Sequence, residues 1–298
     1  MSTITITYGE VCENHVGMQK VGSEGEEGLE FYNLKKAQIY FEKKGYKCQI
    51  IYLNNLLPEG IESEDAWILI VRNGANALGD ADKFLKEQES LDWDTKAKMW
   101  GKVVNKRARW NLCYAPTAQN PNYPAGKGRI VAFEDVRELE TIRGKLQECF
   151  GDKAKDLYAE GNLYYDVDTC FIGWHGDGER KIVIAIRLGA DMPLYYQWYL
   201  RSKPISEKLT ISLNHGDLYA MSTKATGNDW LRKTIPTLRH AAGKVKTKSI
   251  KKLPETREEE LYAMKMVDLK ALLKEKKLKI SGKKALLVAR LLEYESDK

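Results

Sequence analysis

Hydrophobic and polar positions alternate in some stretches of the first hundred residues and repeat with helical spacing in others. Thr3–Tyr8 alternates with a period of two, and Cys48–Leu53 and Ala66–Val71 are short apolar runs, so we predict three strands. Glu27–Lys44 carries apolar residues at helical spacing, and the glycine that follows is well placed to end a helix. Residues 1–100 are therefore predicted to form an N-terminal α/β region.

The pattern changes to short strands and turns between Gly161 and Gly243, where the runs KIVIAIRLG and KLTISLNHGDLYAMS occur. Such a strand-dense block predicts a β-sandwich or jelly roll. Ahead of it, Val136–Phe150 has helical spacing, and Lys102–Cys113 is basic with embedded aromatic residues. A loop rich in Pro, Asn and Gly follows from Ala115 to Gly128. This loop is typical of a lid over a substrate, or of a plain surface connection.

The C-terminal part of the chain separates from the rest by pattern and by charge. Residues 250–260 are predicted to form a polar linker, and residues 261–298 a pair of amphipathic helices joined by a tight turn at Lys279–Gly282. From Lys244 to the end there are 16 Lys+Arg and 9 Asp+Glu, whereas residues 1–243 hold 32 and 33. The excess positive charge favours a tail that binds a polyanion, or a solvated lysine-rich tail.

The remaining composition excludes two classes of protein. No run approaches the roughly 18 apolar residues of a membrane-spanning helix, and the start MSTITITYGE lacks the basic and apolar regions of a signal peptide. The five cysteines are scattered without a CxxC pair, which is typical of reduced thiols. We therefore expect an intracellular protein that is neither secreted nor bound in a membrane.

Two of the four histidines are candidates for a metal site. In His175-Gly176-Asp177 the imidazole and the carboxylate are two positions apart, so on a strand they point to the same face. His240 follows 63 residues later and could supply a second imidazole. Two histidines and one carboxylate form the facial triad of non-haem iron sites, which leaves three metal positions open.

The C-terminal segment resembles the SAP motif, a small helix-turn-helix module that binds DNA. The residues that carry the resemblance are Val267–Lys270, Leu272, Leu273, Leu278, Ser281–Lys284, Leu287, Arg290 and Leu291. Lys277 stands where the motif usually has glycine. The resemblance implies contacts to the DNA backbone from Ser281, Gly282, Lys283, Lys284 and Arg290. The alternative is a helical hairpin that only docks a protein.

The block Asn162–Gly243 resembles the double-stranded β-helix of Fe(II)/2-oxoglutarate dioxygenases, closest to the AlkB-like group. The resemblance is carried by Asn162-Leu163-Tyr164, by Ile172–Arg180 and by Asn214–Met221. It implies an α+β protein in which residues 101–249 form a jelly-roll oxygenase domain with a lid, between the N-terminal region and the helical hairpin. Asn162 and Tyr164 would then orient 2-oxoglutarate.

The second histidine of the family usually follows the GDLxxM strand closely, but Ser222–Trp230 contains none. We prefer His240, which with His175 and Asp177 would bind Fe(II). A competing alignment matches TLR to the family's TFR strand; Arg239 would then bind 2-oxoglutarate and His240 would not be a ligand. The candidates for the basic group that holds the far carboxylate are Arg239, Lys246 and Lys248.

Together the two resemblances imply a dioxygenase that uses Fe(II), 2-oxoglutarate and dioxygen to demethylate or hydroxylate a DNA base, in the nucleus or at viral or host DNA. Arg107, Arg109 and Trp110 could line the entrance for a flipped base. Two alternatives remain open: a hydroxylase of a DNA-associated protein, and a metal-free DNA-binding protein on an oxygenase fold.

Overall fold

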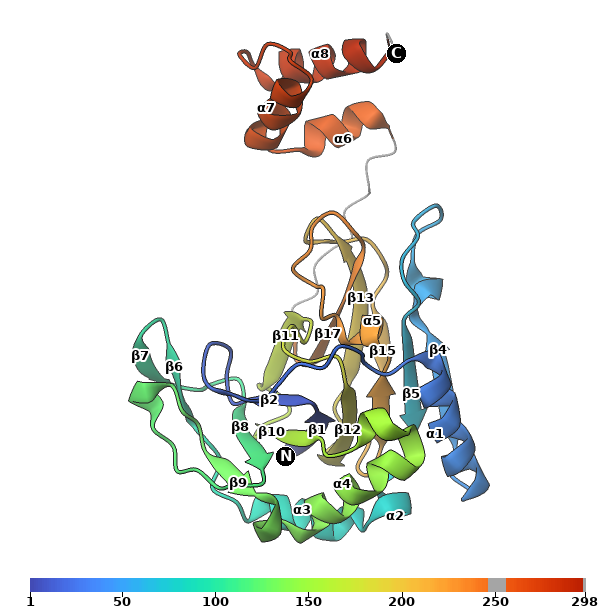
Figure 1. Ribbon diagram of the computed structural model, residues 1–298, viewed down its shortest axis with the longest axis vertical. Helices are drawn as coiled ribbons and strands as arrows, with labels where there is room; N and C mark the ends of the chain where they lie inside the picture. The colour runs from blue at the N-terminus through green and yellow to red at the C-terminus, as the bar shows by residue number, and fades with distance from the viewer. Residues whose placement is uncertain (246–255, 297–298) are drawn as a thin grey trace. The chain divides into compact units, whose positions relative to one another are not determined.

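The chain forms two compact units, Met1–Ile250 and Lys251–Lys298, in a computed structural model that describes residues 1–245 and 256–296 (Figure 1). We call them the body and the tail, and each is described by itself. The body is a mixed α+β unit built on an eight-stranded and a five-stranded sheet, which confirms the α+β part of the predicted fold class. Residues 1–100 and 101–249, which the sequence separates, both lie in this one unit.

An eight-stranded sheet forms the larger layer of the body. Its order is β4 (Cys48–Tyr52), β5 (Trp67–Val71), β16 (Leu218–Met221), β12 (Val183–Gly189), β1 (Thr3–Gly9), β10 (Tyr158–Tyr164), β8 (Trp110–Ala115) and β9 (Ile130–Ala132). The three predicted N-terminal strands are confirmed as β1, β4 and β5. The N-terminal β1 pairs antiparallel with both β10 and β12, so the start of the chain lies within the large sheet.

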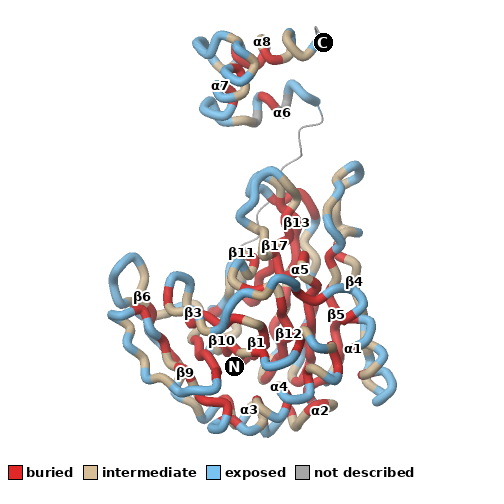
Figure 2. The backbone as a smooth tube through the Cα atoms, viewed as in Figure 1, coloured by how far each residue is buried: buried red, intermediate tan, exposed pale blue. Residues whose placement is uncertain are grey.

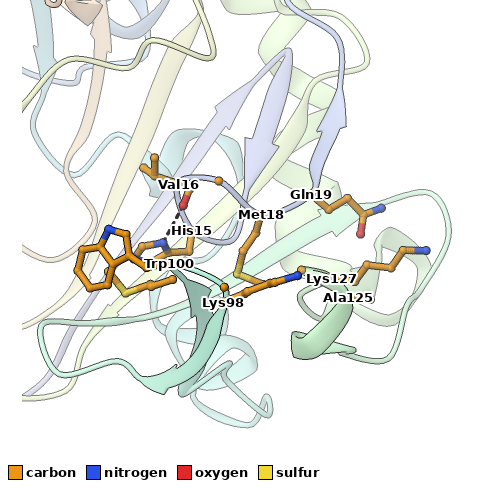
Figure 3. Close-up of a pocket in the computed structure, with 12 residues that line it drawn as sticks. His15, Val16, Met18, Gln19, Lys98, Trp100, Ala125 and Lys127 are labelled. Atoms are coloured by element: carbon orange, nitrogen blue, oxygen red, sulfur yellow. Dashed lines mark hydrogen bonds between the residues drawn. The ribbon is translucent and has the colours of Figure 1, made fainter.

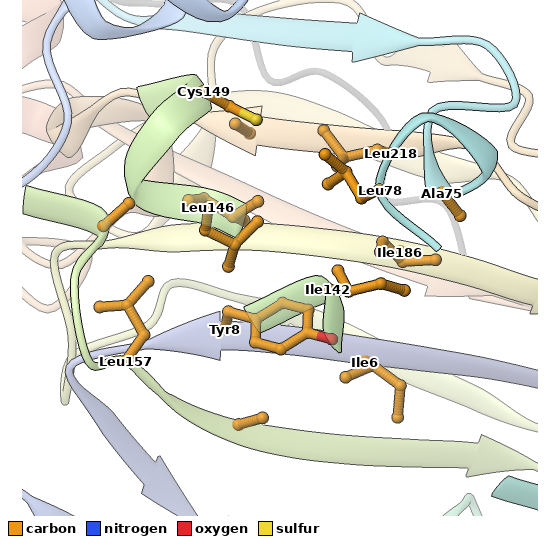
Figure 4. Packing of buried hydrophobic residues seen from close by; sticks show 14 of the residues in the cluster. Ile6, Tyr8, Ala75, Leu78, Ile142, Leu146, Cys149, Leu157, Ile186 and Leu218 are labelled. Atoms are coloured by element: carbon orange, nitrogen blue, oxygen red, sulfur yellow. The ribbon is translucent and has the colours of Figure 1, made fainter. Parts of the chain in front are cut away.

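Helices cover one face of the large sheet, and their apolar sides form the main core with it. The helices that contribute to this core are α1 (Phe31–Lys43), α2 (Ala75–Leu78), α3 (Ala81–Glu89) and α4 (Arg137–Phe150). The short α5 (Thr223–Thr226) packs mainly against β17 instead. Figure 4 shows Ile6 and Tyr8 of β1 and Ile186 of β12 packed against Ile142 and Leu146 of α4. Since side chains alternate along a strand, the intervening residues of these strands face away from the helices.

The smaller sheet contains β11 (Phe171–His175), β17 (Thr237–Gly243), β13 (Leu194–Leu200) and β14 (Lys203–Pro204), with β15 (Leu209–Ile211) also paired to β13. Two hairpins form separate two-stranded sheets: β2 (Val11–Glu13) pairs with β3 (Lys20–Gly22), and β6 (Lys96–Met99) pairs with β7 (Lys102–Asn105). Burial is concentrated in the strands of the two sheets (Figure 2).

The tail has a hydrophobic core of its own. Helices α6 (Arg257–Ala263), α7 (Met266–Glu275) and α8 (Lys284–Ser296) bury leucines and one valine between them. The sequence predicts the second and third of these helices; α6 begins inside the predicted linker 250–260, of which residues 250–255 lie outside the described residues. None of the helices in the two described ranges is both long and apolar enough to span a bilayer.

Candidate metal centre

His175, Asp177 and His240 lie together where β11 pairs with β17 in the smaller sheet. His175 ends β11 and is the direct cross-strand partner of His240 on β17. The Nε2 atoms of the two rings lie 3.4 and 3.5 Å from the same Oδ1 of Asp177, and the ring centroids are 4.3 Å apart. The two Nε2–Oδ1 distances are near the roughly 3 Å expected between neighbouring ligand atoms that each lie about 2.1 Å from one ion.

The backbone orients this group. The Nδ1 of His175 lies 2.8 Å from the carbonyl oxygen of Gly173, which can only accept, so Nδ1 carries the proton and the Nε2 lone pair is free for a metal. Gly176 passes so close to the chain at Gly227 that an added Cβ would lie 2.0 Å from its carbonyl oxygen. A glycine is therefore required between the two ligands, which explains the sequence His-Gly-Asp.

The protonation states suit a cation. Burial lowers the pKa of His240, and the neighbouring His175 lowers it further, so its imidazole is neutral near pH 7. Burial disfavours the charged form of Asp177, but His240, His175 and Arg180 outweigh it and hold the pKa of this carboxyl well below its ordinary value. Two imidazoles and one carboxylate are a donor set that divalent first-row metals accept. The Nδ1 of His240 is buried without a hydrogen-bond partner in the described part of the chain.

The three residues open into a cavity of about 140 Å³, which we call the metal cavity. Its opposite wall is the face of the large sheet that points away from the helices, and this face is polar. One row of it crosses four strands, because Asn111 pairs with Asn162, Asn162 with Thr5, and Thr5 with Arg187. All four side chains line the metal cavity.

Arg187 is the buried cation of this wall. It is 1% exposed, and its Nε and Nη1 atoms have no hydrogen-bond partner in residues 1–245 and 256–296. The hydroxyl of Thr5, its partner across the strands, is likewise buried without a partner. Unpaired buried donors cost free energy, so these two groups form a site prepared for an anion. The sequence interpretation missed both residues; the signal was a single arginine inside the apolar run KIVIAIRLG.

A charged network holds the loop that follows His175. Arg180 binds Glu160 of β10 and Glu179 through Nη2, at 2.5 and 2.6 Å. Asn162, predicted to orient 2-oxoglutarate, accepts hydrogen bonds from Arg109 and Asn111 and donates one to Glu160. Its carbonyl oxygen is thus already engaged, so Asn162 connects β8 and β10 across the wall.

Of the basic residues predicted to bind 2-oxoglutarate, only Arg239 lies within the described residues. Arg239 precedes His240 on β17, so strand alternation sends its side chain to the opposite face, where it stacks on Tyr199 and Trp230. It is not among the residues that line the metal cavity, whereas Tyr164 is. Lys246 and Lys248 lie outside the described residues.

The three residues predicted at the entrance do not share one site: Arg107 and Arg109 precede β8, and Trp110 begins it. Arg109 lines the metal cavity, and Arg107 is exposed. Trp110 packs against Tyr165, with ring centroids 4.8 Å apart, and lines a different depression. The predicted lid, Ala115–Gly128, contributes no residue to the metal cavity.

In the tail, the predicted DNA contacts gather at the start of α8. Ser281, Gly282 and Lys283 are exposed just before the helix, and Lys284 begins it. Arg290 instead donates through Nη1 to the carbonyl oxygens of Lys279 and Ser281, at 2.7 and 2.8 Å. Its guanidinium therefore shapes the turn, and the free backbone N–H groups of the helix start remain available to a phosphate.

The chain is similar to a known domain family in the tail and to a viral protein over most of its length. Residues 263–296 are a SAP domain, the DNA-binding module expected from the sequence. The uncharacterized protein R156 of Acanthamoeba polyphaga mimivirus is 46% identical over 244 residues, which cover 81% of this chain and 95% of the viral protein. A match of that length cannot lie within the tail, so most of it falls in the body.

Proposed function

Because the chain belongs to the family of the mimivirus protein R156, whose similarity takes in most of the body, we propose a function that resides in the body: Fe(II)- and 2-oxoglutarate-dependent oxidation of a DNA base. The observation that carries the proposal is the metal cavity itself. It combines a cross-strand pair of histidines and an aspartate with an unpaired buried arginine.

The order of the strands supports the jelly-roll part of the proposal. Going from β10 to β13, successive strands alternate between the large and the small sheet, as in a jelly roll. After β17 the next strand of such an alternation would return to the large sheet. The position between β10 and β12 is taken by β1, so we infer that the N-terminal strand completes the jelly roll.

Each side chain has a definite task in this proposal. His175, Asp177 and His240 would hold the iron, and Arg187 with Thr5 would bind the far carboxylate of 2-oxoglutarate through a charge-assisted pair. When bound, Fe(II) supplies the activation of dioxygen, with 2-oxoglutarate oxidised to succinate and CO₂ while one oxygen atom enters the substrate. The Arg180–Glu160 pair keeps the loop that bears Asp177 in place.

DNA is the proposed substrate because the same chain carries a SAP domain. A tethered DNA-binding module raises the local concentration of DNA near the metal cavity. The cavity volume of about 140 Å³ suits a small dicarboxylate and leaves the target base at its mouth. The similarity to a viral protein fits action on viral or host DNA.

The test is to incubate the full-length protein with Fe(II), 2-oxoglutarate, air and oligonucleotides that carry N-methylated or C5-methylated bases. Mass spectrometry of the nucleosides should show loss of a methyl group or gain of one oxygen atom, and the His240→Ala variant should leave the DNA unchanged. If the iron-loaded wild-type protein left the methylated oligonucleotides unchanged, a DNA base would be rejected as the substrate.

A further inference from the structure

The hairpin β6–β7 presents an exposed tryptophan at its tip. Trp100 and Gly101 form the turn with positive φ angles of 49° and 78°. A left-handed backbone is unfavourable for a bulky residue, and the side chain of Trp100 is 91% exposed. The left-handed backbone and the exposed indole of Trp100 do not stabilise the fold. Trp100 is therefore a candidate residue for binding a ligand.

A groove of about 560 Å³ lies beside this tip, and we call it the hairpin groove. Figure 3 shows Trp100 next to His15 and Val16 at one end, with Lys98 and Lys127 farther along. No acidic side chain lines it, and neither lysine forms an ion pair within the described ranges. The groove therefore combines a free aromatic face with two free cations.

The hairpin groove also adjoins the metal cavity. His15 and Val16, in the loop between β2 and β3, line both. An added Cβ at Gly17 or Gly101 would meet nothing, so the backbone here is open to a close approach. A polymeric ligand bound in the hairpin groove could thus place its next residue at the mouth of the metal cavity.

We propose that the hairpin groove binds a single nucleic-acid strand, with Trp100 stacked on a base and Lys98 and Lys127 against its phosphates. The inference rests on the proposed function, because it identifies the strand as the one that bears the target base. The volume fits a nucleotide, and a base offers the flat face that an exposed indole pairs with. Phosphates complement the unpaired lysines.

The experiment measures binding of a short single-stranded oligonucleotide that contains 2-aminopurine, a base whose fluorescence falls when it is stacked. The full-length protein carries Lys283→Ala and Lys284→Ala throughout, so that binding by the tail is weakened. Neither iron nor 2-oxoglutarate is added. Trp100→Asn creates the Asn-Gly pair that such a turn favours, so its thermal stability should equal or exceed that of the parent.

We expect Trp100→Asn to weaken binding by about 10-fold and to abolish the quenching of 2-aminopurine. Lys98→Ala with Lys127→Ala should reduce the slope of log K against log salt by about 1.4, the value for two phosphates of a single strand. The matched control is Lys43→Ala on α1, which packs against β4 and β5 at the opposite end of the large sheet from β8 and β9. This variant should change neither quantity.

Unchanged affinity and quenching in Trp100→Asn would overturn the inference, as would preference of the groove for an acidic peptide over the oligonucleotide. Loss of binding together with a lowered melting temperature would assign Trp100 a structural role and also overturn it. Because no iron is present, a protein that binds through Trp100 but oxidises no DNA would keep this inference and reject the proposed function.

Discussion

Arg187 carries a charge in the interior of the body without an acidic partner among the described residues. Burial lowers the pKa of its guanidinium, since the charged form loses its hydration. Such a group is costly to the ligand-free protein and useful only when an anion binds to it. This makes the arginine a sensitive point at which stability and ligand binding should change in opposite directions.

Arg187→Met should raise the free energy of unfolding of the ligand-free protein by about 1–3 kcal/mol, because it removes an unpaired buried charge. With Zn(II) as a redox-inactive ion, 2-oxoglutarate at about 100 times its Kd should add about 2.7 kcal/mol to the wild type and nothing to this variant. Thermal denaturation measures both effects. Arg239→Met is the matched control and should keep the full stabilisation by 2-oxoglutarate. If Arg239→Met lost this stabilisation and Arg187→Met kept it, Arg239 would be the residue that binds 2-oxoglutarate.

Glu13 gives a pH dependence with a definite sign. Burial raises the pKa of this carboxyl from 4.5 to about 7. Between these values the folded protein holds a proton that the unfolded chain has released, so the stability from Glu13 is present below pH 4.5 and is lost as the pH rises through 7. Glu13→Gln, which can still accept the hydrogen bond from the Gly17 N–H, removes this titration.

We therefore expect Glu13→Gln to exceed the wild type in stability by on the order of 2 kcal/mol at pH 8, with a smaller difference at pH 5. Denaturant unfolding at the two pH values measures this. A difference that is the same at both pH values would show that Glu13 has an ordinary pKa.

At the scale of elements, local pattern predicts what local physics determines. The alternation of Thr3–Tyr8 and the helical spacing of Val136–Phe150 are confirmed as β1 and α4, since each depends on a face buried against one neighbouring layer. The pairing of β1 with β10 and β12 joins residues at least 149 positions apart, the smallest separation being from Gly9 to Tyr158, and no local pattern encodes it.

Local pattern also predicts only part of the candidate metal site. His175 and Asp177 share a short motif, so the sequence suffices to name them. The approach of His240 depends on the register between β11 and β17, which includes a bulge, and the competing choice of Arg239 differs from it by one residue. Trp100 was missed because turn rules favour Asn-Gly or Asp-Gly, and a tryptophan at that position carries no turn signal.

The turn between α7 and α8 yields a prediction at this scale. Lys277, which replaces the usual glycine of the SAP motif, has a φ of 58° and is exposed. Lys277→Gly should stabilise the tail by about 0.5–1 kcal/mol, because glycine adopts this conformation without strain. Hydrogen exchange of the buried amides of α8 in the full-length protein measures the gain. Faster exchange in Lys277→Gly would contradict it.

On the scale of the whole molecule, the chain joins a body with a candidate metal centre to a SAP domain. The chain belongs to the family of the uncharacterized viral protein R156, and the proposed chemistry rests on the residues of the metal cavity. DNA binding by the tail and the proposed oxidation by the body can be measured separately, and turnover of 2-oxoglutarate without DNA tests the second.

The most direct measurement is succinate formed from 2-oxoglutarate by the Fe(II)-loaded full-length protein in air, without DNA. The control is His215→Ala, because His215 does not line the metal cavity. Its Nδ1 accepts a hydrogen bond from the Gly189 N–H. We expect succinate from the wild type and from His215→Ala, and none from His240→Ala. Absence of succinate with iron-loaded wild type, or an equal rate from His240→Ala, would contradict this expectation.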